Sequence, residues 1–108
     1  MKGTNLGEFE ELVLLMVGNL HGNAYGITLL EALTERTGRK ITISSVHTAL
    51  YRLEEKGFLR SEMGGASQTR GGRTKRLYVL TAEGHTALVQ TRELRDSLWG
   101  TLPDLGFK

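Results

Sequence analysis

The chain has 108 residues, of which 39% are hydrophobic and none is cysteine, and this length is typical of one small domain. No apolar run approaches the roughly 18 residues of a membrane helix. The longest apolar cluster, residues 12–17, follows three glutamates where a signal peptide would carry cations. Without cysteine there is no disulfide framework and no thiolate metal site, so we expect a cytoplasmic protein with no membrane partner.

The formal net charge of +2 conceals an asymmetry along the chain. Residues 36–76 contain ten of the fourteen Lys and Arg residues and three of the twelve Asp and Glu residues, a local net charge of +7. The flanks, 1–35 and 77–108, contain four cations and nine anions, a net charge of −5. This pattern indicates a surface that faces a polyanion such as nucleic acid. The alternative is a solvated basic loop that serves only solubility.

Two helices are expected in the first third of the chain. Residues 6–20 carry an apolar stripe with helical spacing, made of Phe9, Leu12, Val13, Met16 and Leu20. The glycines of HGNAYG then form a turn, and a second helix is expected from about residue 24 to residue 37. Its predicted inward residues are Ile27, Leu30 and Leu33, a face that Leu29 can extend, and Gly38 ends the helix.

A third helix begins near Thr42 or Ser44 and ends at Gly57. Its buried stripe is predicted to be Val46, Ala49, Leu50 and Leu53. Two short strands follow at 58–63 and 76–80, separated by the basic, Gly-rich segment GGASQTRGGRTK. Helix, strand, basic loop and strand is the order of a winged helix-turn-helix, so the predicted fold is mainly α with a small β-hairpin.

A last helix is expected from Thr81 to about Trp99. Because three helices already supply a core, its apolar seam is predicted to pack against a two-fold copy; the alternative is packing on the first helix of its own chain. We therefore divide the chain into a DNA-binding domain, 1–80, and a dimerisation helix with its tail, 81–108. The predicted dimerisation residues are Leu12, Met16, Ala87, Thr91, Leu94, Leu98 and Trp99.

Three stretches carry a family resemblance: HGNAYG at 21–26, SSVHTALYRLEEKGFLRSE at 44–62, and RLYVLTAEGHTAL at 76–88. Together they resemble the PadR family of bacterial transcriptional regulators, over roughly residues 8–90. The resemblance implies a dimeric winged-helix repressor that binds a pseudo-palindromic operator, in the short form with a single C-terminal dimerisation helix. Family members often carry Tyr-Pro where this chain has His47-Thr48, so their base preference is not transferred to that position.

The predicted DNA contacts lie on the third helix, the second helix and the wing. Contacts to base edges, or to groups adjacent to them, are predicted for Ser45, His47, Thr48 and Arg52. Tyr51 either reaches the sugar-phosphate backbone or packs beneath the wing, and Tyr25 is either a phosphate contact or a half-buried core aromatic. The wing candidates are Arg70, Arg73 and Lys75, with Arg76 at the base of the strand.

Trp99 is the only tryptophan, and Leu98 and Leu102 lie beside it. These three residues either form a pocket for a small hydrophobic or aromatic effector across a two-fold axis, or anchor the interface. No metal site is predicted, because the three histidines are far apart in sequence. No nucleophile–base pair, P-loop or HExxH motif is present, so we expect neither an enzyme nor a cofactor.

The sequence therefore predicts a sequence-specific DNA-binding regulator, and in particular a dimeric repressor. The alternative is a winged-helix module that docks a protein through the third helix and the wing. Small polar groups on the third helix favour DNA, because protein-docking surfaces normally expose an aromatic or aliphatic patch.

Overall fold

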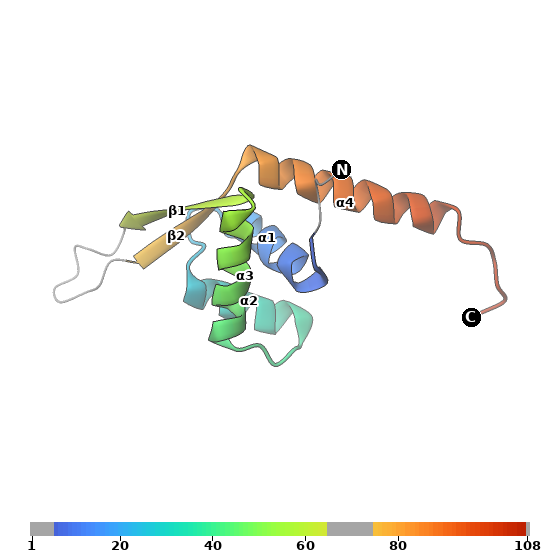
Figure 1. Ribbon diagram of the computed structural model, residues 1–108. Helices are drawn as coiled ribbons and strands as arrows, with labels where there is room; N and C mark the ends of the chain where they lie inside the picture. The colour runs from blue at the N-terminus through green and yellow to red at the C-terminus, as the bar shows by residue number, and fades with distance from the viewer. Residues whose placement is uncertain (1–5, 65–74, 108) are drawn as a thin grey trace.

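The computed structural model describes residues 6–64 and 75–107. Four helices and one antiparallel hairpin follow one another along the chain (Figure 1): α1 (Glu8–Asn19), α2 (Gly26–Thr37), α3 (Ile43–Glu55), β1 (Leu59–Gly64), β2 (Lys75–Leu80) and α4 (Ala82–Gly100). This order confirms the predicted mainly helical fold with a small hairpin, and the predicted ends of the elements agree with the structure to within about two residues.

The core is the bundle of α1, α2 and α3, closed on one side by the hairpin. Its largest fully buried side chains are Leu14, Leu29, Leu33, Leu50, Leu53, Val13, Val17 and Val46. All four residues predicted for the stripe of α3 are buried, as expected for apolar groups spaced by three and four. Full burial of one such side chain stabilises the fold by about 1.5–3 kcal/mol.

The predicted inward face of α2 was wrong at Ile27. Its side chain is 56% exposed, whereas Leu29 is fully buried and Leu33 is 1% exposed. Because each helical residue advances by about 100°, Ile27 lies roughly 160° around the helix from Leu29. The two cannot share the core-facing stripe, and Ile27 instead lies on the surface beside α3.

The hairpin is fastened to both neighbouring helical segments. β1 pairs with β2 from Leu59 opposite Leu80 to Gly64 opposite Lys75. The backbone N–H of Tyr78 donates to the carbonyl of Ala24 at 2.9 Å, which joins β2 to the turn before α2. Side-chain bonds from Arg76 to Ser61 and from Ser61 to Glu54 join the strands to α3. The two strands therefore have a defined direction relative to the third helix.

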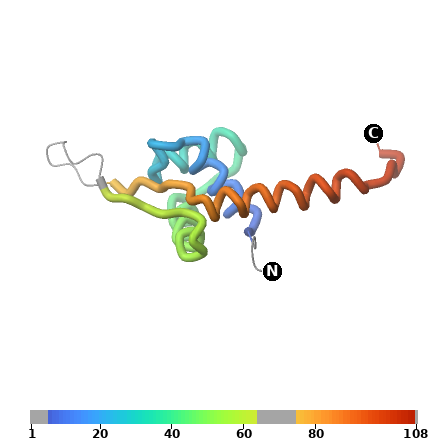
Figure 2. Tube along the Cα trace, turned by 90° about the horizontal axis from the view of Figure 1, so that it is seen from above, coloured from blue at the N-terminus to red at the C-terminus, as the bar shows by residue number. Residues whose placement is uncertain are grey.

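α4 begins against the hairpin and then leaves the body of the molecule. The hydroxyl of Thr81 accepts from the backbone N–H of Gly84 at 3.0 Å, so Thr81 is the predicted N-cap. The strands lie at one end of the elongated molecule and the C-terminal end of α4 at the other (Figures 1 and 2). Within the described residues, no helix has the length and hydropathy needed to cross a membrane.

Gly84 sets how closely α4 approaches the hairpin. An ideal Cβ at this position would lie 2.2 Å from the carbonyl oxygen of Phe58 and 2.9 Å from Cδ1 of Leu80. The first contact is with backbone, which cannot rotate away. A glycine at this place in the helix is therefore required by the packing of α4.

Gly84→Ala is expected to lower the free energy of unfolding by about 1–3 kcal/mol, because the overlap outweighs the gain in helix propensity. Chemical denaturation followed by circular dichroism measures this change. Gly100→Ala is the matched control in the same helix, because nothing lies within 4 Å of its added Cβ. A Gly84→Ala variant as stable as the wild type would show that α4 is not fixed by this contact.

Candidate nucleic-acid interface

α3 is capped at its start and presents one continuous exposed edge. The hydroxyl of Thr42 accepts from the backbone N–H of Ser45 at 3.1 Å, which satisfies one free donor of the first turn. Opposite the buried stripe, helical spacing aligns four exposed residues; this outward line consists of Ser44, Thr48, Tyr51 and Glu55. Short polar groups on a protruding helix are the kind that can enter a groove of a duplex.

The predicted base-contacting residues do not all lie on this line. Ser45 is half-buried and its hydroxyl donates to the carbonyl of Thr42 at 2.8 Å. Ser45 and Arg52 face the side of α3 that borders the first turn of α1, where Thr48 also contributes to a shallow hollow. His47 lies on the opposite side of α3, toward α2 and β2.

Ser44 is also a candidate DNA contact, although the sequence suggests only a role as helix cap for it. Its side chain is exposed at the start of the outward line. The spacing from Ser44 to Thr48 and from Thr48 to Tyr51 is four and three residues, so the helical period of α3 could have identified it.

Tyr51 lies on the surface rather than beneath the wing. Its side chain is 63% exposed, and its hydroxyl donates to a carboxylate oxygen of Glu55 at 3.1 Å. This hydrogen bond, together with the negative charge of Glu55, raises the pKa of Tyr51 above its usual value. The outward line thus ends in an anion, which limits how closely a phosphate can approach that end.

Part of the predicted basic surface is neutralised by the acidic start of α1. Arg39 donates to both carboxylate oxygens of Glu8, at 3.2 and 2.5 Å, and Lys56 pairs with Glu10 at 2.7 Å. The hydrogen bond from Arg39 holds the pKa of Glu8 below its usual value. Other cations of the 36–76 segment form no ion pair with any residue that the structure describes: Arg36, Lys40, Arg52, Lys75 and Arg76.

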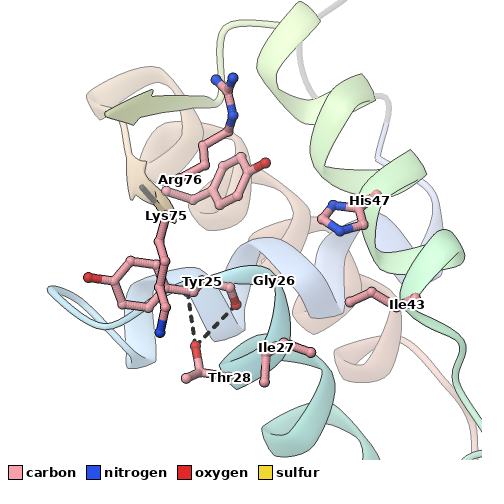
Figure 3. Close-up of a pocket in the computed structure, with 9 residues that line it drawn as sticks. Tyr25, Gly26, Ile27, Thr28, Ile43, His47, Lys75 and Arg76 are labelled. Carbon is pink, nitrogen blue, oxygen red and sulfur yellow. Dashed lines mark hydrogen bonds between the residues drawn. The ribbon is translucent and has the colours of Figure 1, made fainter. Parts of the chain in front are cut away.

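A hollow of about 540 Å³ lies between the start of α2, the start of α3 and the edge of β2 (Figure 3). Tyr25 is half-buried at its side, and Nζ of Lys75 lies 5.3 Å from the centre of the Tyr25 ring. This is within reach of a cation–π interaction, so the ring positions the Lys75 ammonium above the hollow. Both interpretations of Tyr25 therefore stay open, since the residue is half-buried and also lies beside a cation.

His47 packs closely on the first turn of α2. Cε1 of its imidazole lies 3.0 Å from the place where a Cβ on Gly26 would stand, and Cδ1 of Ile43 lies 3.8 Å from it. The absence of a side chain at Gly26 therefore allows the imidazole to lie against α2. Arg70 and Arg73, the other wing candidates, lie outside the described residues.

The predicted dimerisation seam becomes steadily more exposed along α4. Ala87 is 2% exposed and Thr91 is half-buried, whereas Leu94 and Leu98 are 60% and 61% exposed. Met16, at 7% exposed, belongs with Ala87 to the core of the single chain and offers little surface to a partner. Leu12 is half-buried against the same core.

Trp99 is 72% exposed near the end of α4. Together with Arg95, Leu98 and Leu102 it lines a shallow hollow of about 240 Å³. A second hollow, of about 420 Å³, lies between α1 and α4 and has Trp99 at its edge. Within the described residues, no three His, Asp or Glu side chains are grouped so that they could hold a metal ion.

The comparison with known protein families decides the classification. The transcriptional regulator PadR-like family matches residues 13–90, which include α2, α3, the hairpin and most of α1. The chain belongs to this family. PadR-like proteins are transcriptional regulators rather than a family of enzymes.

Solved structures agree with the PadR-like fold. A PadR family transcriptional regulator from Eggerthella lenta DSM 2243 has 28% sequence identity and a TM-score of 0.66, and the match covers 86% of this chain and 80% of that one. A PadR-like transcription factor from bacteroid fragilis has 23% identity and a TM-score of 0.71, with 86% and 84% covered. The complex structure of hsRosR-S1 has 25% identity and a TM-score of 0.71, with 93% and 81% covered. Among curated proteins, none matches the sequence.

Replacing Glu55 with Gln is expected to lower the pKa of Tyr51 toward its usual value, because the carboxylate that opposes the phenolate is removed. A pH titration of the Tyr51 ring signals by NMR measures the change. Glu35→Gln, an exposed substitution on α2, serves as the control and is expected to leave the Tyr51 titration unchanged. An identical titration in Glu55→Gln and wild type would mean that the hydrogen bond is not populated in solution.

Proposed function

We propose that this PadR-like protein is a sequence-specific DNA-binding repressor that acts as a homodimer in the cytoplasm. The observation that carries the proposal is the outward line of α3, which is exposed along its length and begins with two short polar residues, Ser44 and Thr48. The cations on either side of it, Arg52 and Lys75, form no ion pair with a described residue and supply attraction for phosphates. In this arrangement α3 enters the major groove and the wing contacts the backbone or the minor groove.

Within this proposal the residues of α3 divide between two tasks. Ser44, Thr48 and His47 reach base edges, because they lie at the exposed start and middle of the helix. Arg52 lies toward α1 and binds the flanking backbone or a guanine edge. Ser45 contributes chiefly through the start of the helix, since its hydroxyl is already bonded to Thr42.

Dimerisation is supported by the seam of α4. Its residues 87, 91, 94 and 98 share one face, and burial on that face decreases from Ala87 to Leu98 as the helix leaves its own domain. The exposed leucines therefore continue a buried face without a partner from the same chain. A two-fold copy of α4 would cover these exposed leucines on each chain. The resulting dimer would present two copies of α3 to a pseudo-palindromic operator.

Effector binding remains part of the proposal through Trp99. Its indole ring is largely exposed beside Leu98 and Leu102, at the end of the seam that we assign to the dimer. A two-fold copy would bring a second indole near this place and form an apolar slot suited to a flat aromatic ligand. The simpler role of the same residue is an interface anchor.

Replacing Arg70 and Arg73 together with Ala is expected to weaken binding to every duplex. The slope of log K against log salt should become shallower by about one to two units, because each lost phosphate contact removes roughly 0.9. Fluorescence anisotropy titrations at several salt concentrations measure the slope. Arg92→Ala is the matched control, since Arg92 is an exposed cation on α4, outside both α3 and the wing. An unchanged slope in the double variant would exclude a phosphate-binding wing.

Replacing Leu98 with Asp is expected to produce a monomer, because a charge on the seam would be buried against its own copy. Size-exclusion chromatography with light scattering measures the mass. Ser97→Asp adds the same charge on the neighbouring exposed residue, off the seam, and should remain dimeric. A wild-type chain that is monomeric, or a dimeric Leu98→Asp variant, would contradict the proposed interface.

A further inference from the structure

The hollow beside His47 combines a cationic rim with an apolar floor. Lys75 and Arg76 supply the rim from β2. Ile27 and Ile43 supply the floor from the first turns of α2 and α3, and both are exposed, at 56% and 37%. Figure 3 shows the two isoleucines on adjoining turns below the imidazole of His47.

An apolar floor is not what phosphate binding requires. Phosphate oxygens are bound by cations and by N–H and O–H donors, and an isoleucine offers none of these. Exposed isoleucines next to two cations are therefore unexplained by backbone contacts alone. They need a partner that presents an anion and an apolar group a short distance apart.

DNA presents this combination in the major groove. Thymine is the one base whose major-groove edge carries a methyl group, and the phosphates of its strand run alongside that edge. Ile43 is the first residue of α3 and His47 lies one turn further along, so both would face the groove wall next to α2. The packing of His47 on Gly26 fixes the imidazole at the side of the floor.

We propose that the hollow is a thymine-selecting subsite, in which Ile27 and Ile43 contact the 5-methyl group and Lys75 contacts a flanking phosphate. The assignment rests on the proposed DNA-binding function and adds to it one specified base. Its specificity comes from burial of a methyl group rather than from hydrogen bonds. Each half-site of the operator therefore contains at least one thymine whose methyl group the protein reads.

The experiment uses the full-length chain and an operator selected from random duplexes by the protein itself. Each thymine of one half-site is replaced in turn by deoxyuridine, which lacks only the methyl group. At one or two positions the wild type should lose about four- to tenfold in affinity, as expected for a methyl group buried in one complex and absent from the other. The remaining thymines serve as internal controls.

The double variant Ile27→Ala/Ile43→Ala tests whether the loss of affinity for deoxyuridine arises from contacts in the hollow. It should bind the thymine operator more weakly than wild type, and should no longer distinguish thymine from deoxyuridine at the sensitive position. Ile43→Ser removes every methyl group from this position at the start of α3 and tests the same point if the double variant is poorly folded. Circular dichroism establishes folding in both cases.

Two results would overturn the subsite while leaving DNA binding intact. One is a wild-type protein that binds its operator equally well with deoxyuridine at every position. The other is a sensitive thymine that stays sensitive in both isoleucine variants, because the methyl group is then read elsewhere. Failure to bind any duplex, even at low salt, would overturn the proposed function and the subsite together.

Discussion

The burial of one stripe of α3 determines most of what the molecule can present to a partner. Val46, Ala49, Leu50 and Leu53 are all in the core, so the rotation of the helix about its own axis is fixed. Once that rotation is set, the outward line and the side that carries Ile43 and His47 follow from the helical period alone. Rotating the helix by one residue would bury a polar group and expose a leucine. The exposed surface of α3 is thus determined by which of its residues are buried in the core.

Ion pairs in this protein shape its surface charge more than they stabilise its fold. The acidic start of α1 pairs with Arg39 and Lys56, which come from the turn before α3 and from its end. Such exposed or partly exposed pairs contribute little to stability, because solvent screens the charges. Their larger effect is on the potential, since they neutralise cations on the side of α3 next to α1. On the other side of that helix, Lys75 and Arg76 on β2 form no ion pair with any residue in the described part of the chain.

The sequence predicted the elements well because their signals are local. Thr42 and Thr81 are N-caps, the stripe of α3 has clear spacing, and the two strands follow directly. The error at Ile27 has a physical cause: α2 carries Ile27, Leu29, Leu30 and Leu33, and two different stripes fit this pattern. Only the position of α1 and β2 decides between them. A lone sequence does not contain that information.

The details of the candidate interface were less predictable, because they depend on pairs distant in sequence. Gly84 and Phe58 are in contact across the hairpin, and Glu8 meets Arg39 across two helices. The apolar hollow also combines α2, α3 and β2, and no single segment contains its pattern. Residue types suggested which side chains could bind DNA. Their neighbours determine which of them already form hydrogen bonds within the chain. Ser45 donates to Thr42 in this way, and Tyr51 donates to Glu55.

The junction between the wing and α4 links the two proposed interfaces mechanically. The carbonyl of Phe58 accepts from the backbone N–H of Thr81 at 3.1 Å, and the same carbonyl lies against Gly84. The start of α4 therefore cannot tilt without displacing Phe58, which lies in the short connection from α3 to β1. In a dimer built through the far half of α4, a change in the crossing angle of the two helices would alter the separation of the two recognition helices. Half-site spacing is set by that separation. A ligand bound beside Trp99 would then act on DNA through the length of α4.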